Sequence, residues 1–360
     1  MAPEAGRKRR YIPALDALRG LGISAVLLRH SWPDRFGAGG FVGVELFFVL
    51  SGYLITSILV GEFQSGRLSY RRFYVNRILR LVPALTVMVL FVVLVVVVFN
   101  PLSDRRHLLS GTVRGLTYTD DIPELPLHPL TELTHLWTLA IEEQFYIIWP
   151  VVLVTAAAHG ARRLRQTTWA VLAVSLMALL ATVAYGYHTN DVEGIYEWPT
   201  NWAVTLAAGC ALAIGVFKLR ISSRFVAPVL VALLAISLLP EAKSRAWTYL
   251  LVLPLIAVLS LCLISNATSE APSRILINPA LRYLGKISYA TYLWDFPLSK
   301  WFPGPVAIPL ALAAAWVSFW LVEQPFLKLK THAPQGPSTR PGVAVLDDGR
   351  AQAVVTGAVE

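Results

Sequence analysis

Hydrophobic residues recur along the chain in ten long runs separated by shorter polar segments. The runs cover 11–32, 41–60, 81–99, 136–158, 167–188, 198–217, 225–240, 246–265, 283–302 and 305–326. A helix needs roughly 20 apolar residues to cross the hydrocarbon core of a bilayer, and most of these runs approach or exceed that length. The pattern therefore predicts an all-α fold: a polytopic membrane bundle of ten transmembrane helices, within a transmembrane domain over 11–327.

The segments between and beyond the runs carry the polar residues. A basic stretch occupies 1–10, and a Pro/Gly/Ala-rich stretch over 328–360 predicts a disordered cytoplasmic tail. The proline-containing stretch 100–135 predicts a loop with a short re-entrant piece at 107–118. When the N-terminus is placed in the cytoplasm, 19 Lys and Arg residues fall on inner loops and seven on outer loops. This bias predicts that both termini are cytoplasmic and that the protein lies in the inner (plasma) membrane.

The composition agrees with a membrane protein. Hydrophobic residues make up 56% of the chain and charged residues only 15%, which excludes an ordinary soluble enzyme, a disordered chain and a coiled coil. The net charge of +9 is explained by cytoplasmic loops, so we expect the lipid bilayer and not nucleic acid as a partner. Cys210 and Cys262 both lie in apolar runs, which predicts neither a disulfide framework nor a cysteine metal site.

Ionisable side chains inside a span are costly, and each is a candidate for function. Asp16 and Arg19 are one helical turn apart in the first run and can pair. Arg19 and His30 are eleven residues apart, which places them on one side of a helix about 16 Å from each other along its axis. The spacing alone fits equally well an interfacial histidine and an arginine that stabilises the bundle.

Three further runs contain carboxylates. Glu45 lies at about the depth of His30, so we expect it to be the partner of the imidazole. Glu142 shares a helical face with His135, whereas the neighbouring Glu143 points about 100° away. Asp295, in the ninth run, has no evident partner.

Arginine and small residues complete the pattern. Arg77 and Arg80 share one helical face at the inner boundary of the third run, where a pair of guanidinium groups suits a phosphate-bearing ligand. Ser51 and Gly52 are expected to let helices approach closely rather than to supply a nucleophile.

Taken together, these strings resemble the membrane-bound acyltransferase-3 family over about residues 11–326. The motifs are Arg19 with His30, Phe47-Phe48-Val49-Leu50-Ser51-Gly52, Arg77-Ile78-Leu79-Arg80, His135-Leu136-Trp137 through Glu142-Glu143-Gln144-Phe145-Tyr146, Ser288-Tyr289 through Tyr292-Leu293-Trp294, and Glu323-Gln324-Pro325. The resemblance implies an enzyme that transfers acyl groups, often acetyl, from acyl-CoA to hydroxyls of sugars, cell-envelope glycans or macrolide-type natural products. It implies acyl-CoA, with acetyl-CoA expected, as a donor substrate and no permanently bound cofactor or metal.

The resemblance also implies roles for single residues. His30 matches the catalytic base, Arg19 its partner, Glu142 the motif acid, and Arg77 with Arg80 the pair that holds the acyl-CoA donor. Glu45 is expected to join the catalytic group because of its depth. Contacts with substrate are expected from Asp16, Ser51, Trp137, Tyr292 and Asp295.

Three positions differ from the family pattern. Glu45 stands where many members have Asp, so the charge is kept. Asp295 stands where many have His, so no role that needs an imidazole carries over. Asn201 and Trp202 stand where an arginine is frequent.

The expected mechanism has His30 deprotonate the acceptor hydroxyl, Glu45 or Glu142 orient the imidazole, and Arg19 stabilise the oxyanion. Composition and buried charges alone fit a proton-coupled transporter or flippase equally well, although no internal repeat supports that class. A third possibility is an acyltransferase-like scaffold or sensor without activity.

Overall fold

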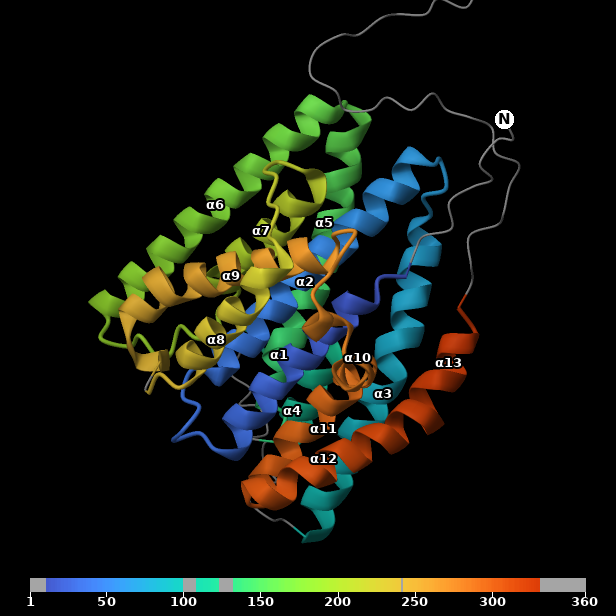
Figure 1. The fold of residues 1–360 in the computed structure, drawn as a ribbon. Helices are drawn as coiled ribbons and strands as arrows, with labels where there is room; N and C mark the ends of the chain where they lie inside the picture. Colours follow the sequence, from blue (N-terminus) through green and yellow to red (C-terminus); the bar gives the residue numbers. More distant parts are fainter. Residues whose placement is uncertain (1–10, 100–107, 123–131, 241, 331–360) are drawn as a thin grey trace, which may run out of the picture.

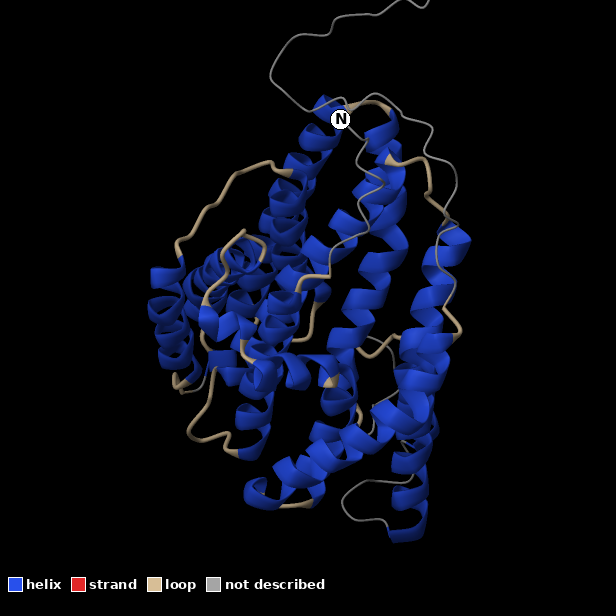
Figure 2. Ribbon diagram, turned by 45° about the vertical axis from the view of Figure 1, so that its right-hand side comes forward, coloured by secondary structure: helices blue, strands red, loops and turns tan. Residues whose placement is uncertain are grey.

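The computed structural model describes residues 11–99, 108–122, 132–240 and 242–330, and within these ranges the chain forms helices and no strands (Figure 2). The α-helices are α1 (Pro13–Ser31), α2 (Gly39–Gln64), α3 (Tyr70–Phe99), α4 (Leu108–Thr117), α5 (Trp137–Ala158), α6 (Ala161–His188), α7 (Pro199–Ile214), α8 (Val226–Ser237), α9 (Leu253–Ala267), α10 (Pro279–Lys286), α11 (Ser288–Trp301), α12 (Gly304–Ser318) and α13 (Gln324–Lys328). The all-α prediction is confirmed. The basic segment 1–10, most of the tail and parts of the loop 100–135 lie outside the described residues.

All ten apolar runs fold as helices, with differences at their boundaries. The ninth run is divided at Ile287 into α10 and α11. The eighth begins with a π-helical turn, Thr248–Val252, and the last contains another, Phe319–Glu323. Within 100–135, α4 forms where a short re-entrant piece was expected; whether it enters a membrane stays a prediction.

Six helices in the described ranges are long and apolar enough to cross a bilayer. They run over Gly39–Gln64, Tyr70–Phe99, Thr134–Ala158, Ala161–His188, Thr248–Ala267 and Gly304–Lys328. Large hydrophobic side chains are exposed along the outer helices, for example Leu94 of α3, Met177 of α6 and Leu321 in the π-helical turn that follows α12. Lipid is the environment that tolerates so much exposed apolar surface, so the chain is a multi-pass membrane protein. The number of ten crossings stays a prediction.

Helices α1 and α2 lie at the centre of the bundle, with α6 to α9 on one side and α3 and α12 on the other (Figure 1). Helix α2 packs closely on α7, because Gly52 faces the Leu206 carbonyl and Gly209 faces the Val49 carbonyl, leaving no space for a Cβ atom. Glycine permits this approach of two backbones in a membrane bundle. The expectation for Gly52 is therefore confirmed.

The two ends of the bundle hold different parts of the chain. The junctions of α2 with α3 and of α5 with α6 lie at the upper end in Figure 1, and the end of α1 and the junction of α11 with α12 lie at the lower end. Arg19 lies near the start of α1 and His30 near its end. Arg19 is therefore farther from the lower end of the molecule than His30. The core of the bundle contains the fully buried Phe41, Phe48 and Trp202.

Candidate functional site

Two cavities penetrate the bundle. The first, which we call the arginine cavity, has a volume of about 210 Å³ and is lined from α1, α2, α3, α5 and α11. Its polar lining residues are Arg19, Ser51, Arg77, Arg80, Thr138, Glu142, Tyr146, Ser288, Tyr289 and Tyr292. The expected donor residues Arg77 and Arg80 thus share one cavity with Arg19 and Glu142.

The second, which we call the histidine cavity, has a volume of about 560 Å³. Its polar and aromatic lining includes Arg29, His30, Phe41, Thr134, His135, Trp137, Thr138, Tyr196, Glu197, Lys243, Tyr292, Phe296, Ser299 and Lys300. Pro33 and Lys300 on this lining are exposed, so the cavity reaches the lower end of the molecule.

The two cavities meet at three residues that line both: Val44, Thr138 and Tyr292. The Tyr292 hydroxyl donates a hydrogen bond to the His135 carbonyl oxygen. The Thr138 hydroxyl lies 2.5 Å from the Tyr292 hydroxyl. These bonds hold α11 to the start of α5 at the boundary. A ligand that reaches from the arginines toward His30 must pass these side chains.

His30 forms the central polar contact of the histidine cavity. Its Nδ1 atom lies 2.6 Å from Oδ2 of Asp295 on α11, and Asp295 is fully buried whereas the His30 side chain is 20% exposed. Phe296 packs edge-on against the imidazole at a centroid distance of 4.9 Å. A buried carboxylate on one ring nitrogen leaves the other ring nitrogen for the substrate, as in hydrolases with a His–Asp pair.

The prediction that Glu45 or Glu142 is the partner of His30 was wrong. Glu45 is fully buried, neither of its carboxylate oxygens accepts a hydrogen bond from any described residue, and it lines neither cavity. Glu142 lines the arginine cavity and accepts a hydrogen bond of 2.6 Å from the Ser51 hydroxyl. Glu142 is seven positions after His135, which corresponds to about 10 Å along a helix. This distance places Glu142 outside the cavity that His135 lines.

Arg19 and Asp16 pair as predicted, with Nη1 of the arginine 3.1 Å from Oδ1 of the aspartate. Asp16 lines neither cavity, and Tyr11 also donates to it. Arg19 lies in the arginine cavity, about 16 Å along α1 from His30. It therefore cannot stabilise an oxyanion beside His30, because that role needs a hydrogen bond of about 3 Å.

The remaining two arginines of the arginine cavity differ in their partners. Arg77 binds Glu143 through two nitrogens at 2.7–3.0 Å, and its guanidinium carbon lies 3.2 Å from the centroid of the Tyr146 ring. Arg80 lines the same cavity, has an exposed side chain and forms no ion pair within 4 Å with a described carboxylate, although the charge of Glu323 acts on it. Arg80 therefore has its donors available for an anionic ligand, whereas Arg77 is held in place.

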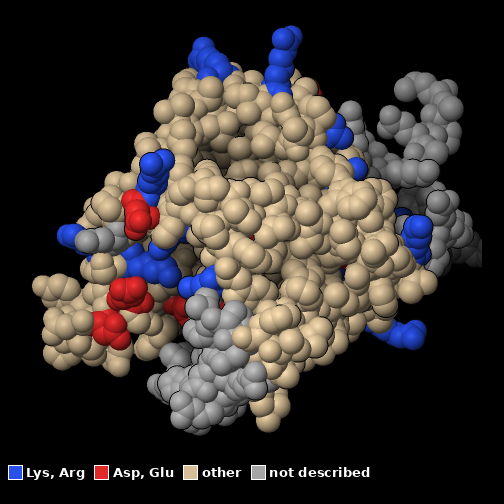
Figure 3. Space-filling model, turned by 90° about the horizontal axis from the view of Figure 1, so that it is seen from below, with Lys and Arg blue, Asp and Glu red and all other residues tan. Residues whose placement is uncertain are grey.

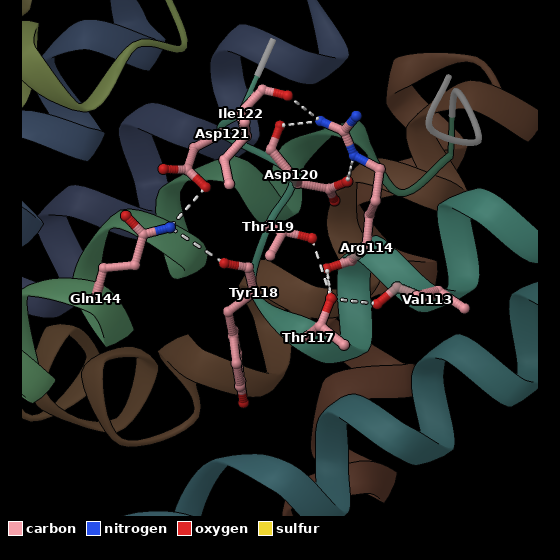
Figure 4. Close-up of polar contacts among 9 residues, drawn as sticks. All are labelled: Val113, Arg114, Thr117, Tyr118, Thr119, Asp120, Asp121, Ile122 and Gln144. Atoms are coloured by element: carbon pink, nitrogen blue, oxygen red, sulfur yellow. Dashed lines mark hydrogen bonds and ion pairs between the residues drawn. The ribbon is translucent and has the colours of Figure 1, made fainter. Parts of the chain in front are cut away.

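Three consecutive side chains of α5 bind three different parts of the chain. Glu142 binds Ser51 of α2, Glu143 binds Arg77 of α3, and the Gln144 amide donates to the Tyr118 carbonyl and to Asp121 (Figure 4). The segment that follows α4 is also hydrogen-bonded to α4, since Arg114 donates to the backbone carbonyls of Asp120 and Ile122 (Figure 4). This turn of α5 therefore fixes the wall of the arginine cavity.

Trp137 lines the histidine cavity, where its ring packs against Tyr196 at 5.1 Å and Trp202 at 5.3 Å. Trp202 is fully buried and fills the core. The His135 ring stacks on Phe296 at 5.0 Å in the same cavity. The sequence predicted no role for His135, although the His135-Leu136-Trp137 motif contains it. The described residues contain no group of three or more His, Cys, Asp or Glu side chains suited to hold a metal ion.

The chain is similar to several bacterial O-acetyltransferases. YrhL of Bacillus subtilis is 37% identical over 228 residues, 59% of this chain and 35% of that protein. The peptidoglycan O-acetyltransferase OatA of Listeria monocytogenes is 35% identical over 222 residues, 57% of this chain and 34% of that protein. The O-acetyltransferase OatA of Staphylococcus aureus is 32% identical over 211 residues, again 57% of this chain and 34% of that protein.

The match spans about a third of the length of these relatives. No solved structure matches the chain. The acyltransferase-3 family model, described as an acyltransferase domain, matches residues 12–322, which include both cavities. The chain belongs to the acyltransferase-3 family.

Proposed function

We propose that the protein is an integral membrane O-acetyltransferase that moves an acetyl group from acetyl-CoA to a hydroxyl of a carbohydrate or cell-envelope glycan. The observation that carries this proposal is the meeting of two cavities, one with arginines and one with a carboxylate-bound histidine. Two substrates that react with each other need two sites that touch. The relatives named as O-acetyltransferases favour acetyl as the acyl group and a glycan as the acceptor.

The donor occupies the arginine cavity. Arg80 binds a phosphate of CoA because no ion pair with a described carboxylate occupies its donors. Arg77, stacked on Tyr146 and fixed by Glu143, presents a second guanidinium face. The pantetheine arm then extends between Arg19 and Ser51 toward Thr138 and Tyr292, which places the thioester at the boundary between the cavities.

His30 removes the proton from the acceptor hydroxyl. Asp295 accepts a hydrogen bond from Nδ1–H of His30, so Nε2 carries the lone pair that takes the proton. The alkoxide oxygen attacks the thioester carbonyl, the carbon–sulfur bond breaks, and the thiolate of CoA takes the proton back from the imidazolium. The products are the acetyl ester and free CoA, and His30 is neutral again.

Trp137 and Tyr292 contact the acceptor in this scheme, because both line the histidine cavity beside His30. Asp295 acts through His30 and is a positioning residue. The scheme places the arginine cavity toward the cytoplasm, where CoA is found, with ten crossings, both termini inside and the protein in the plasma membrane.

The test uses purified protein in nanodiscs with acetyl-CoA and a set of sugar acceptors. Release of CoA that depends on the acceptor, together with an acetylated product in the mass spectrum, is expected. His30→Ala should abolish product formation, whereas His159→Ala, an exposed histidine at the end of α5, should leave it unchanged. Full activity of the His30→Ala variant would remove this residue from the chemistry.

The same preparation separates the enzyme from a transporter. Movement of a labelled solute into liposomes without consumption of acetyl-CoA would support the proton-coupled transporter or flippase instead. Acceptor-dependent consumption of the thioester supports the acetyltransferase.

A further inference from the structure

Three basic side chains line the histidine cavity: Arg29, Lys243 and Lys300. They come from α1, from the segment before α9 and from α11, so distant parts of the chain converge on one space. None of the three forms an ion pair with a described residue. Unpaired cations that line a cavity favour an anionic ligand.

Aromatic rings hold two of these cations in the cavity wall. The Lys243 ammonium lies 4.0 Å from the centroid of the Tyr196 ring, and the Lys300 ammonium lies 5.0 Å from that of Phe296. Phe296 also packs against His30, so Lys300 lies one ring away from the imidazole. The positive charges are therefore close to the group that acts on the acceptor.

Acidic side chains in the same cavity are fewer. Glu197 is the single acidic residue among the described lining residues, and it acts electrostatically on Lys243. Asp295 is fully buried behind His30 and does not line the cavity. Figure 3, which views the lower end of the molecule, shows acidic side chains among basic ones on the left of a largely uncharged face, with further basic side chains at its upper and right edges. The cavity itself keeps an excess of positive charge.

We propose that the histidine cavity selects an acceptor that carries an anionic group, a carboxylate or a phosphate, close to the hydroxyl that is acetylated. The anion lies against Lys243, Lys300 and Arg29, and the hydroxyl faces His30. This inference rests on the proposed function in one respect, namely that the histidine cavity holds the acceptor. It names the chemical class of that acceptor.

The experiment compares matched acceptors that differ in charge. The carboxylate arm uses the methyl glycoside of N-acetylmuramic acid and its neutral carboxamide. The phosphate arm uses N-acetylglucosamine 1-phosphate and the neutral methyl glycoside of N-acetylglucosamine. Binding to the protein in nanodiscs is measured by calorimetry, and acetyl transfer from acetyl-CoA is measured separately.

At least one anionic acceptor should bind about tenfold or more tightly than its neutral counterpart, and the arm that shows this identifies the anion. The double variant Lys243→Gln with Lys300→Gln should reduce that preference to less than threefold. Arg35→Gln removes an exposed positive charge at the same end that does not line the cavity, and it should keep the full preference.

Equal binding of charged and neutral acceptors in both arms would overturn the inference, as would a preference that survives in the double variant. Because binding is read without turnover, the two proposals fail differently. If the unmutated protein binds the anionic acceptor more tightly but transfers no acetyl group, the anionic subsite is supported and the proposed function is contradicted.

Discussion

The two cavities differ in whether their basic side chains form ion pairs. In the arginine cavity, Arg19 and Arg77 are each neutralised by a carboxylate of the protein, and only Arg80 has no such partner among the described residues. In the histidine cavity the three basic side chains form no ion pair with a described carboxylate, although Glu197 acts electrostatically on Lys243, and the ion pair is formed by His30 with the buried Asp295.

The difference shows what each cavity is prepared to bind. Paired arginines keep a fixed shape and add little net charge, so they suit a ligand that is positioned mainly by shape and by one phosphate contact. Unpaired cations are ready to neutralise a ligand's charge.

The largest effect is expected from the pair in the histidine cavity. Asp295→Asn should lower kcat by about 100-fold or more, because an amide no longer holds the proton on Nδ1 of His30. The Kd of acetyl-CoA should stay unchanged, and the pH profile of kcat should shift, with partial rescue by Asp295→Glu. Single-turnover kinetics across pH measure this.

Asp34→Asn is the matched control, because Asp34 is an exposed carboxylate at the same end and lines neither cavity. An Asp295→Asn variant with normal kcat and an unchanged pH profile would show that this pair is structural.

A smaller effect is expected in the arginine cavity. Arg80→Gln should raise the Kd of acetyl-CoA about tenfold, the size expected for one charge-assisted hydrogen bond of about 1.5 kcal/mol, and should leave kcat at saturation nearly unchanged. Arg71→Gln, on the exposed start of the same helix, should change neither value. If Arg80→Gln instead lowered kcat and left the Kd unchanged, the donor assignment would be wrong.

The boundary between the cavities should respond more weakly. Tyr292→Phe removes the hydrogen bond to the His135 carbonyl and should lower kcat about three- to tenfold, in line with a net hydrogen bond of about 0.5–1.5 kcal/mol. Tyr289→Phe removes a similar bond to the Leu81 carbonyl inside one cavity only. It should lower the melting temperature comparably without the same loss of kcat.

The smallest effect concerns pH. Burial lowers the pKa of Lys243, with Arg29 and Lys300 acting in the same direction and Glu197 and Glu193 opposing them. Lys243 is charged below its pKa, so the preference for an anionic acceptor should decline as pH rises, at lower pH than for a free lysine. Binding measured from pH 7 to 10 checks this. The same decline in Lys243→Gln would assign it to another group.

The sequence predicted the helices, but not which of their faces meet. Ten apolar runs were enough for the all-helical fold, and the Asp16–Arg19 pair followed from spacing within one turn. The partner of His30 did not follow, because spacing along α1 says nothing about a contact with Asp295 of α11. Depth comes from position along a helix, whereas the direction of a side chain depends on how helices rotate against one another.

The positive charges of the histidine cavity were also beyond prediction from sequence. Lys243 and Lys300 are 57 positions apart and lie in unrelated segments, so nothing in the sequence connects them. Their convergence depends on the packing of the segment before α9 near the end of α11. Glu143 was set aside because it points away from Glu142, yet this divergence is what lets one turn of α5 bind two helices.

Helix α1 carries Arg19 into one cavity and His30 into the other, and a single helix is a rigid spacer. A bisubstrate inhibitor, with a CoA-like portion joined to an acceptor mimic, therefore has its linker length dictated by this helix, about 16 Å for eleven residues. Linking the two halves converts the second binding event into an intramolecular one, so even weak fragments gain affinity when the tether matches that span.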